Sequence, residues 1–413
     1  YQISQYDLPF CADGHIDVEV DGDGVAQRLD LDSVTPLEDG EGYSTRIGIT
    51  RIHLEEDTGK MVHVGGSEGR IAGATRSLVD FNRAGTPLME LVTEPDIRTP
   101  EEARRFAQKL RLIWLSLGIS DCNMEEGSMR VDANVSIRRR GETEFGVKSE
   151  VKNMNSFKAL HDALAYEIVR QADELESGGV VVQETRHWDA AAKRTSSLRS
   201  KEEAHDYRYF PEPDLLPLTV SEEWLDSIRR TMPAMPAELR RRFVEEYGLR
   251  VYDAQVLTAS RELADYFMAV VESCGDARAA ANWVTGDLAA LLNAAGLDIA
   301  LCPVAPERLG ELISLIQKGE LTGKLAKEIL PKMFESRESA RTIMEREGLR
   351  AMSDVGELER IIDQVIEANP KQLEQYRSGK TSLLQFFVGQ VMKATRGQAN
   401  PAALSELLKK KLS

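Results

Sequence analysis

The stretch His15-Ile16-Asp17-Val18-Glu19-Val20-Asp21 alternates polar and apolar residues at every step. This period of two is typical of a half-buried β-strand, with Ile16, Val18 and Val20 on the buried face. An apolar strand face has to be covered by other elements, so this stretch predicts sheet structure in the first part of the chain.

More strands are expected on the C-terminal side of this stretch. Asp21-Gly22-Asp23-Gly24 is predicted to form a turn into a second strand through Leu29 and Leu31. The clearest alternation of the chain comes later, from Arg130 to Arg138, where apolar and polar residues take opposite faces.

The strand predicted near Arg46 to Glu56 changes phase within its length. Ile47 and Ile49 share one phase of the alternation, whereas Ile52 and Leu54 share the other. Either a β-bulge or burial of both faces would explain this change.

Two helices are expected among the strands. One begins at Thr99-Pro100-Glu101-Glu102, an N-cap followed by proline at the first helical position and glutamate at the third. The other runs from about Ser156 to Ser177 and ends at Gly178-Gly179. Together with the strands, these helices indicate an α+β domain.

The pattern becomes helical after Ser221 and stays so to the end of the chain. We therefore predict an α+β domain at residues 1–220, an all-α helical domain at 221–345 and a helical tail domain at 346–413. The boundary between the last two is expected near Gly348 to Asp354.

The composition is that of a soluble globular protein, since 42% of the residues are hydrophobic and 29% are charged. No apolar run reaches membrane-spanning length, and the four cysteines form no C-x-x-C pair, which favours a reducing cytoplasm. The net charge of -16 argues against nucleic-acid binding over the whole surface. The chain begins at Tyr1 without methionine, so we expect either processing or a start inside a longer protein.

Common motifs do not account for the chain. Gly379-Lys380-Thr381 is similar to the end of a P-loop, but Glu374 occupies the position of that motif's first glycine. No serine or cysteine has the neighbours of an activated nucleophile. A reaction that takes nitrogen from glutamine would therefore need another protein chain to release it.

The last 34 residues are basic in an otherwise acidic chain, with six lysines and arginines against Glu406 alone. From its charge alone, this basic stretch is more typical of a solvated helix end than of a contact with phosphates. The basic residues considered for binding are Lys393, Arg396, Lys409, Lys410 and Lys411.

Four polar segments are not explained by packing. They are His53 to Lys60, Asp80 to Glu90, Met124 to Arg130 and Ser149 to Phe157. The first places three consecutive carboxylates at the end of an apolar strand, which a divalent cation would stabilise, although an exposed acidic loop is the simpler interpretation. In the second, Glu90 is flanked by apolar residues, and a buried carboxylate needs a partner charge or a metal.

These segments resemble the signature stretches of the B-subunit family (GatB/GatE) of tRNA-dependent amidotransferases. The resemblance runs from Tyr1 to the C-terminus and includes Gln183 to Arg186, Asp206 to Asp214 and Gly389 to Lys393. An N-terminal segment of the family, which carries an E-x-H strand with a further acid and histidine of the metal site, is absent from this chain.

The resemblance implies an ATP-dependent ligase. The family amidates the side chain of Glu-tRNA(Gln) or Asp-tRNA(Asn), after ATP has converted the carboxylate into an acyl phosphate. It uses Mg²⁺, and by resemblance Glu56 and Glu90 are its metal-coordinating acids, with Glu55 the adjacent catalytic candidate. Weaker candidates for contacts with phosphate or substrate carboxylate are Arg83, Arg130, Lys152, Arg186 and Arg208.

The family also implies a fold and partners. The α+β part resembles a cradle domain related to glutamine synthetase, and the helical part with its basic tail resembles tRNA-binding modules. Ammonia is expected from an amidase-type A subunit, with a small C subunit completing a heterotrimer.

Two other functions stay open at this point. A non-catalytic tRNA-binding scaffold would keep the helical region and the basic tail but make the acids structural. A free-standing ligase that uses ammonia would need no partner proteins.

Overall fold

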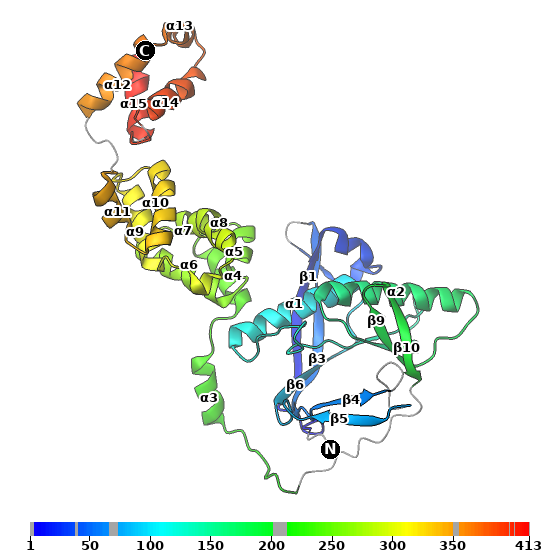
Figure 1. Ribbon diagram of the computed structural model, residues 1–413. Coiled ribbons are helices and arrows are strands. Elements are labelled where there is room, and N and C mark those ends of the chain that lie inside the picture. The colour runs from blue at the N-terminus through cyan, green and yellow to red at the C-terminus, as the bar shows by residue number, and fades with distance from the viewer. Residues whose placement is uncertain are drawn as a thin grey trace. The chain divides into compact units, whose positions relative to one another are not determined.

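Strands and helices are interspersed in the first part of the structure, and every named element of the later part is a helix (Figure 1). The structure is a computed structural model that describes residues 4–37, 40–65, 73–200, 213–349, 355–395, 397–399 and 401–412. The chain divides into two compact units, Tyr1–Met232 and Pro233–Ser413. The fold is therefore mixed α+β.

Within the described residues, the first unit has one sheet in the order β1-β3-β2 with β6 paired to β3, a second in the order β10-β9-β8-β7, and the hairpin β4-β5. The strands are β1 (Cys11–Asp21), β2 (Thr35–Pro36), β3 (Gly42–Glu56), β4 (Lys60–Val64), β5 (Arg76–Asp80), β6 (Pro87–Thr93), β7 (Ala133–Val135), β8 (Ser149–Lys152), β9 (Glu184–Asp189) and β10 (Arg194–Ser200). The helices are α1 (Pro100–Leu117), α2 (Phe157–Glu176) and α3 (Glu222–Thr231), with the short 3-10 helices η1 (Gly22–Gln27) and η2 (Leu31–Ser33).

The alternation predicted for the opening stretch is confirmed in β1. Ile16, Val18 and Val20 are buried, while the residues between them are exposed. They pack with β3, to which β1 pairs antiparallel, and with Phe106 and Leu110 of α1. One face of this sheet is therefore sealed by a helix, which leaves the other free for polar groups.

The change of phase in β3 is a register shift. The ladder between β3 and β6 is irregular between Ile49 and Arg51, as a bulge in β3 requires. Beyond it, Ile52 lies opposite Leu91, and both pack against the core that contains Ile49. Of the two explanations that the sequence left open, the structure shows the bulge. It turns the end of β3 so that alternate residues from Arg51 onward lie on the other face.

Both predicted helix starts are confirmed. The Thr99 side chain accepts a hydrogen bond from the backbone N–H of Glu102, and Pro100 opens α1. The Ser156 side chain caps α2 in the same way, by accepting from the N–H of Ala159.

Two predicted strands are wrong or shorter than expected. The chain after β1 forms η1 and η2 instead of a strand through Leu29 and Leu31. Arg28 explains this, because its guanidinium pairs with the buried carboxylate of Glu102 at 2.7 Å and holds the loop against α1. The strand expected from Arg130 to Arg138 is limited to β7, since only its centre pairs with β8.

A buried carboxylate joins α2 to the second sheet. Glu167 is fully buried and accepts hydrogen bonds from Arg170, from Gln171 and, at 2.9 Å, from the hydroxyl of Thr195. Arg186 lies at 3.4 Å from the same carboxylate. Burial alone would raise the pKa of Glu167, but the hydrogen bonds and the charge of Arg170 outweigh it, and the pKa is lowered.

The second unit has two hydrophobic clusters. Leu239 to Met344 contribute to the first and Leu358 to Leu412 to the second. The helices are α4 (Pro236–Glu245), α5 (Val251–Leu257), α6 (Arg261–Cys274), α7 (Ala277–Trp283), the π-helix η4 (Val284–Leu288), α8 (Ala289–Ala295), the 3-10 helix η5 (Ile299–Leu301), α9 (Pro306–Gln317), α10 (Gly323–Ser336), α11 (Ala340–Glu347), α12 (Val355–Glu367), α13 (Pro370–Arg377), α14 (Leu383–Ala394) and α15 (Pro401–Leu412).

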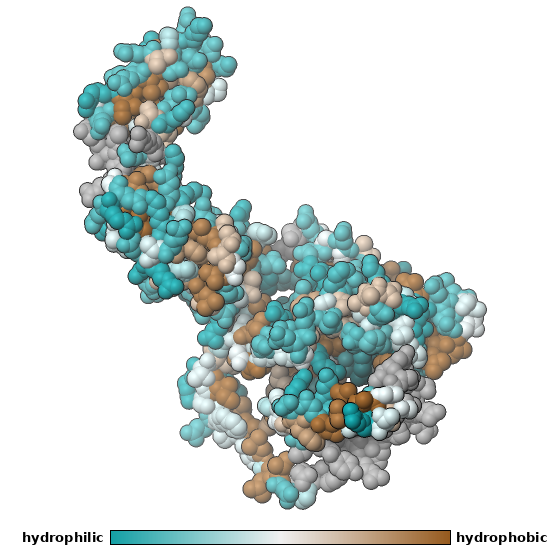
Figure 2. All heavy atoms as spheres, viewed as in Figure 1, coloured by the Kyte–Doolittle hydropathy of each residue, from teal (hydrophilic) through white to brown (hydrophobic). Residues whose placement is uncertain are grey.

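Helix α3 differs from the α-helices α1 and α2 of the first unit because none of its residues is buried. Its apolar residues Trp224 and Ile228 are exposed, as is Met232 just after it, and apolar side chains are visible along this segment in Figure 2.

Among the described helices, none combines the length and the apolar character that crossing a membrane would require.

Replacing Glu167 by glutamine should destabilise the first unit by about 3 kcal/mol, because Arg170 loses its buried counter-charge. Chemical denaturation near neutral pH measures this, with the exposed Glu176→Gln on the same helix as the control. Since the pKa of Glu167 is lowered on folding, the wild type should also lose stability as the pH falls below about 4.5 and passes through the folded-state pKa, and the variant should lack this part of the loss. Equal stability of the two variants would contradict this role for Glu167.

Candidate functional site

Two carboxylates and a histidine meet where β3 pairs with β6. His53 and Glu55 come from β3, and Glu90 comes from β6. The His53 Nε2 atom lies 3.1 Å from Oε1 of Glu55 and 3.5 Å from Oε2 of Glu90. One potential ligand atom from each residue lies within 4.8 Å of the others. We call these three residues the acidic group.

The strand register brings the acidic group together. His53 lies directly opposite Glu90 in the antiparallel ladder, so their side chains share one face. Glu55 is two residues beyond His53 and returns to that face, because strand side chains alternate. The group therefore needs only two strands and a fixed register.

Burial is graded across the acidic group. The side chain of His53 is 1% exposed and that of Glu55 is 15% exposed, whereas that of Glu90 is 54% exposed. Partial burial, together with the charge of Glu55, raises the pKa of Glu90. Glu90 is thus the member of the group that is most exposed to solvent.

The donor set fits a hard divalent cation. Two carboxylates repel each other in a partly buried site, and a cation between them would remove that cost. Carboxylate oxygens are the ligands that Mg²⁺ prefers, whereas imidazole suits softer metals. The Nδ1 atom of His53 is buried without a hydrogen-bond partner among the described residues, so Nε2 is the ring atom that engages the acids. The two carboxylates are therefore the groups that could hold a cation, and His53 is placed beside them where it can fix their direction.

The chain N-terminal to β1 lies along the end of β3. The Ser4 hydroxyl donates to Glu55 at 3.2 Å, and the N–H of Gln5 donates to the carbonyl of Leu54 at 2.8 Å. The Tyr6 ring meets the His53 ring edge-on, with 5.8 Å between centroids. This segment covers one side of the acidic group.

Glu56 is not brought to Glu90, contrary to the metal pair expected from the sequence. Glu56 lies opposite Pro87 in the ladder, one residue out of phase with Glu55. Its side chain is therefore directed to the opposite face of the strand pair. Glu55 takes the place beside Glu90 that was expected of Glu56. His53 was missed as a site residue, and its signal was the H-x-E spacing within a predicted strand.

Arg83 lies beside the segments that flank the acidic group. Its guanidinium pairs with Asp57 at 3.1 Å, just after β3 ends. A Cβ atom placed on Gly127 would lie 3.9 Å from the Nη1 atom of Arg83. The first three polar segments singled out in the sequence thus converge at this guanidinium, which is about half exposed.

The other predicted contacts of phosphate or substrate carboxylate fall into different settings. Lys152 pairs with Asp132 at 3.0 Å and with Glu150 at 3.3 Å. Burial alone would lower the pKa of Lys152, but these two acids outweigh it and raise the pKa. Arg130 is exposed, and Arg208 lies outside the described residues.

Arg186 is largely buried and forms its ion pairs within the second sheet and with α2. Its side chain is 12% exposed and pairs with Glu184 and Glu167, and its Nε donates to the Thr195 hydroxyl at 2.8 Å. Its charge is already matched by internal acids, which leaves little for an incoming anion.

The basic residues of the tail lie on two helix ends. Lys393 is in the last turn of α14 and is exposed, and Arg396 lies outside the described residues. Lys409, Lys410 and Lys411 are in the last turn of α15. Lys409 and Lys410 are exposed, whereas Lys411 pairs with Asp363 of α12 at 2.6 Å. Lys411 therefore has a structural partner that the sequence did not indicate.

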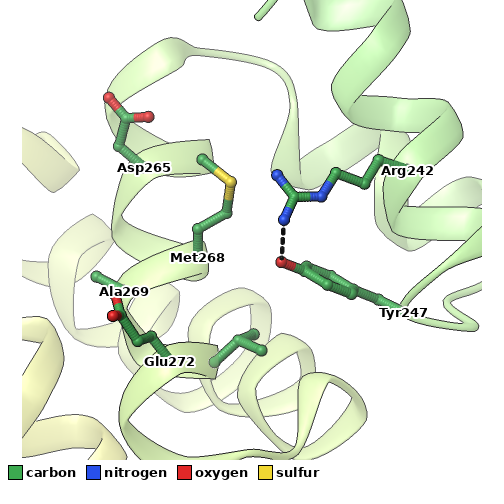
Figure 3. A pocket seen from close by; sticks show the side chains of 7 residues that line it. Arg242, Tyr247, Asp265, Met268, Ala269 and Glu272 are labelled. Atoms are coloured by element: carbon green, nitrogen blue, oxygen red, sulfur yellow. Dashed lines mark hydrogen bonds between the residues drawn. The ribbon is translucent and has the colours of Figure 1, made fainter.

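A pocket of about 440 Å³ with a mixed polar and apolar lining lies in the second unit. Arg242 and Tyr247 form one side, with the guanidinium donating to the phenol at 3.2 Å, and side chains from α6 form the other (Figure 3). Arg242 also pairs with Glu246 at 3.1 Å, so its charge is already engaged. None of the predicted site residues lines this pocket.

Two family models match most of this chain. Residues 1–226 match the family model described as the GatB/GatE catalytic domain, and residues 265–412 match the one described as the GatB domain. The acidic group lies within the first of these ranges.

Similar curated proteins share the whole length of the chain. All three examples here are named as the B subunit of aspartyl/glutamyl-tRNA(Asn/Gln) amidotransferase. The protein of Carboxydothermus hydrogenoformans is 52% identical over 413 residues, covering 100% of this chain and 81% of the relative. Those of Moorella thermoacetica and Geobacter sulfurreducens are 50% and 49% identical, with 100% of this chain and 81% of each relative covered. The chain belongs to the GatB/GatE family.

Proposed function

We propose that this chain is the B subunit of a ligase that amidates the side-chain carboxylate of Glu-tRNA(Gln), Asp-tRNA(Asn) or both. The observation that carries the proposal is the acidic group, a carboxylate pair held by strand register inside the range that matches the family's catalytic domain. The relatives that are 52% and 50% identical to this chain are named as the B subunit of such an amidotransferase.

The chemistry requires activation of the carboxylate before nitrogen is added. A carboxylate oxygen of the aminoacyl group attacks the terminal phosphorus of ATP, and ADP leaves. Ammonia then attacks the carbonyl carbon of the acyl phosphate, loses a proton, and inorganic phosphate leaves with the former carboxylate oxygen. Both steps depend on placing anionic groups close together.

Glu55 and Glu90 would hold Mg²⁺, while His53 fixes the direction of their carboxylates. The chemistry that the ion supplies when bound is neutralisation of charge on the phosphoryl oxygens. Glu56, on the opposite face, is left without a part in this arrangement. Solvent exposure of Glu90 gives the substrate access from its side.

Arg83 and Arg130 are the arginines that we propose for contact with phosphate or with the substrate carboxylate. Arg83 is half exposed and stands where three polar segments meet, and Arg130 is exposed at the end of one of them. Lys152 is a weaker candidate for such a contact, since its ammonium group already pairs with Asp132 and Glu150.

We propose that ammonia comes from an amidase-type A subunit, because no serine or cysteine in the sequence has the neighbours of an activated nucleophile. A small C subunit completes the assembly. The cysteines of the chain are unpaired, in keeping with a reaction in the cytoplasm.

The domain assignment follows from the same proposal. Residues 1–220 form the catalytic cradle, residues 221–345 a helical domain and residues 346–413 a tail that binds tRNA. Separate hydrophobic clusters in the last two ranges support a division between them. The exposed lysines at the end of α15 supply the positive charge that a tRNA backbone needs.

Replacing Glu90 or Glu55 by glutamine should lower kcat for ATP-dependent amidation by about a hundredfold or more, because one ligand to the cation is lost. The measurement uses the full-length protein reconstituted with its A and C subunits and each mischarged tRNA. Glu56→Gln is the matched control, since it makes the same change one residue away on the opposite face, and its activity should stay within a few-fold of the wild type.

Amidation that survives both Glu55→Gln and Glu90→Gln, with tRNA binding unchanged, would favour the non-catalytic scaffold over the ligase. Activity without the partner proteins, with ammonium as the nitrogen source, would favour a free-standing ligase.

Reversing the charge of Lys409 and Lys410 together should weaken tRNA binding and make it less dependent on salt, by about one unit of the log–log slope for each lost phosphate contact. Filter binding across a range of salt concentrations measures the slope. Lys371→Glu, on the neighbouring helix α13, is the control for reversing the charge of an exposed lysine elsewhere in the tail domain. An unchanged slope in the double variant would remove the tail from the tRNA contact surface.

A further inference from the structure

Arg51 stands next to the acidic group and has no part in the chemistry described so far. It is two residues before His53 on β3, beyond the register shift, so its side chain shares the face of His53 and Glu55. Its neighbours across the ladders are Ala12 on β1 and Val92 on β6, which carry no charge. An arginine at this place therefore has no acid directly opposite it.

The guanidinium of Arg51 is held in place by an aromatic ring. Its central carbon lies 4.1 Å from the centroid of the Tyr6 ring, which also packs edge-on against His53. Stacking fixes the plane of a guanidinium and leaves its N–H donors directed outward along that plane. Tyr6 thus orients Arg51 and His53 at the same time.

One N–H donor of Arg51 finds no acceptor among the residues that the structure describes. Its Nε atom is buried and has no hydrogen-bond partner in the described part of the chain. A buried donor without an acceptor costs about 1–3 kcal/mol. Arg28, Arg170 and Arg186 of the same unit differ in this respect, because each is paired with a buried glutamate.

Charge balance indicates what Arg51 would bind. Glu55 and Glu90 together carry two negative charges, which one divalent cation would cancel. With the cation bound, Arg51 adds a further positive charge at the edge of a partly buried site. In a chain of net charge -16, such a local excess of positive charge is needed to attract a polyanion.

We propose that Arg51 is a phosphate-binding residue of this site, whose guanidinium, oriented by Tyr6, donates hydrogen bonds to the terminal phosphoryl oxygens of ATP. The inference rests on the proposed function and adds a residue to it. Arg51 binds the phosphoryl group from the protein side while the carboxylates hold the cation, so the transferred group is positioned by two different kinds of charge.

The test is ATP binding by isothermal titration calorimetry, on the full-length protein, with and without Mg²⁺. Arg51→Gln should weaken ATP binding about tenfold or more in both conditions and leave AMP binding nearly unchanged, because AMP lacks the terminal phosphate. Arg51→Lys keeps the charge but loses the planar donor geometry. Its affinity for ATP should lie between those of the wild type and Arg51→Gln. Arg46→Gln on the same strand is the matched control, since Arg46 is exposed and pairs with Asp17.

Tyr6 provides an independent readout of the orienting role. Tyr6→Phe keeps the ring and should bind ATP like the wild type, whereas Tyr6→Ala should weaken binding in the same direction as Arg51→Gln. Thermal unfolding of each variant verifies that it is folded, and Arg51→Lys serves if Arg51→Gln is not.

The outcomes separate the two claims. A wild-type protein that binds no ATP overturns the proposed function and this inference with it. A wild type that binds ATP, with Arg51→Gln and Arg51→Lys binding it equally well, overturns the role of Arg51 alone. A loss of affinity for AMP equal to that for ATP would place Arg51 away from the terminal phosphate and also contradict the inference.

Discussion

The register between β3 and β6 is the constraint on which the candidate site depends. His53 lies opposite Glu90, and this pairing decides which of the neighbouring acids, Glu55 or Glu56, can reach Glu90. A slip by one residue would exchange the two faces and dissolve the acidic group. The irregularity between Ile49 and Arg51 gives the sheet an apolar side toward the core and a polar side at its end. One bulge therefore connects the packing of the first unit to its proposed chemistry.

Glutamates of the same unit show how differently this protein treats a buried carboxylate. Glu102 and Glu167 are fully buried and matched by arginines, and the pKa of Glu167 is lowered as a result. Glu90 has a second carboxylate beside it, and its pKa is raised. The first two carboxylates hold elements together, whereas the acidic group keeps an electrostatic cost that a bound cation would relieve. This contrast distinguishes the site more clearly than the number of acidic residues does.

Local patterns predicted the elements that local physics determines. The alternation of β1 and the caps at Thr99 and Ser156 are confirmed, because each depends on neighbouring residues. The strand expected through Leu29 and Leu31 failed because Arg28 pairs with Glu102, a residue 74 positions away. Long-range pairs of this kind leave no signature in a short window of sequence.

The same limit applies to the site. The resemblance identified the segments that hold Glu55, Glu56 and Glu90, but choosing between the first two required the strand register. The place of Arg186 in the Glu167 network likewise depends on how α2 packs on β9 and β10. Arg83 lies close to Gly127, although their loops are distant in sequence, and only the folded chain shows this proximity.

The central claim is that Glu55 and Glu90 hold one divalent cation between them. Crystals of the full-length protein soaked in Mn²⁺ would locate that ion by its anomalous scattering, without reliance on turnover. The account predicts one strong peak within bonding distance of carboxylate oxygens from both residues, with Glu56 directed away from it. A peak at Glu56, or none between Glu55 and Glu90 at saturating Mn²⁺, would contradict it.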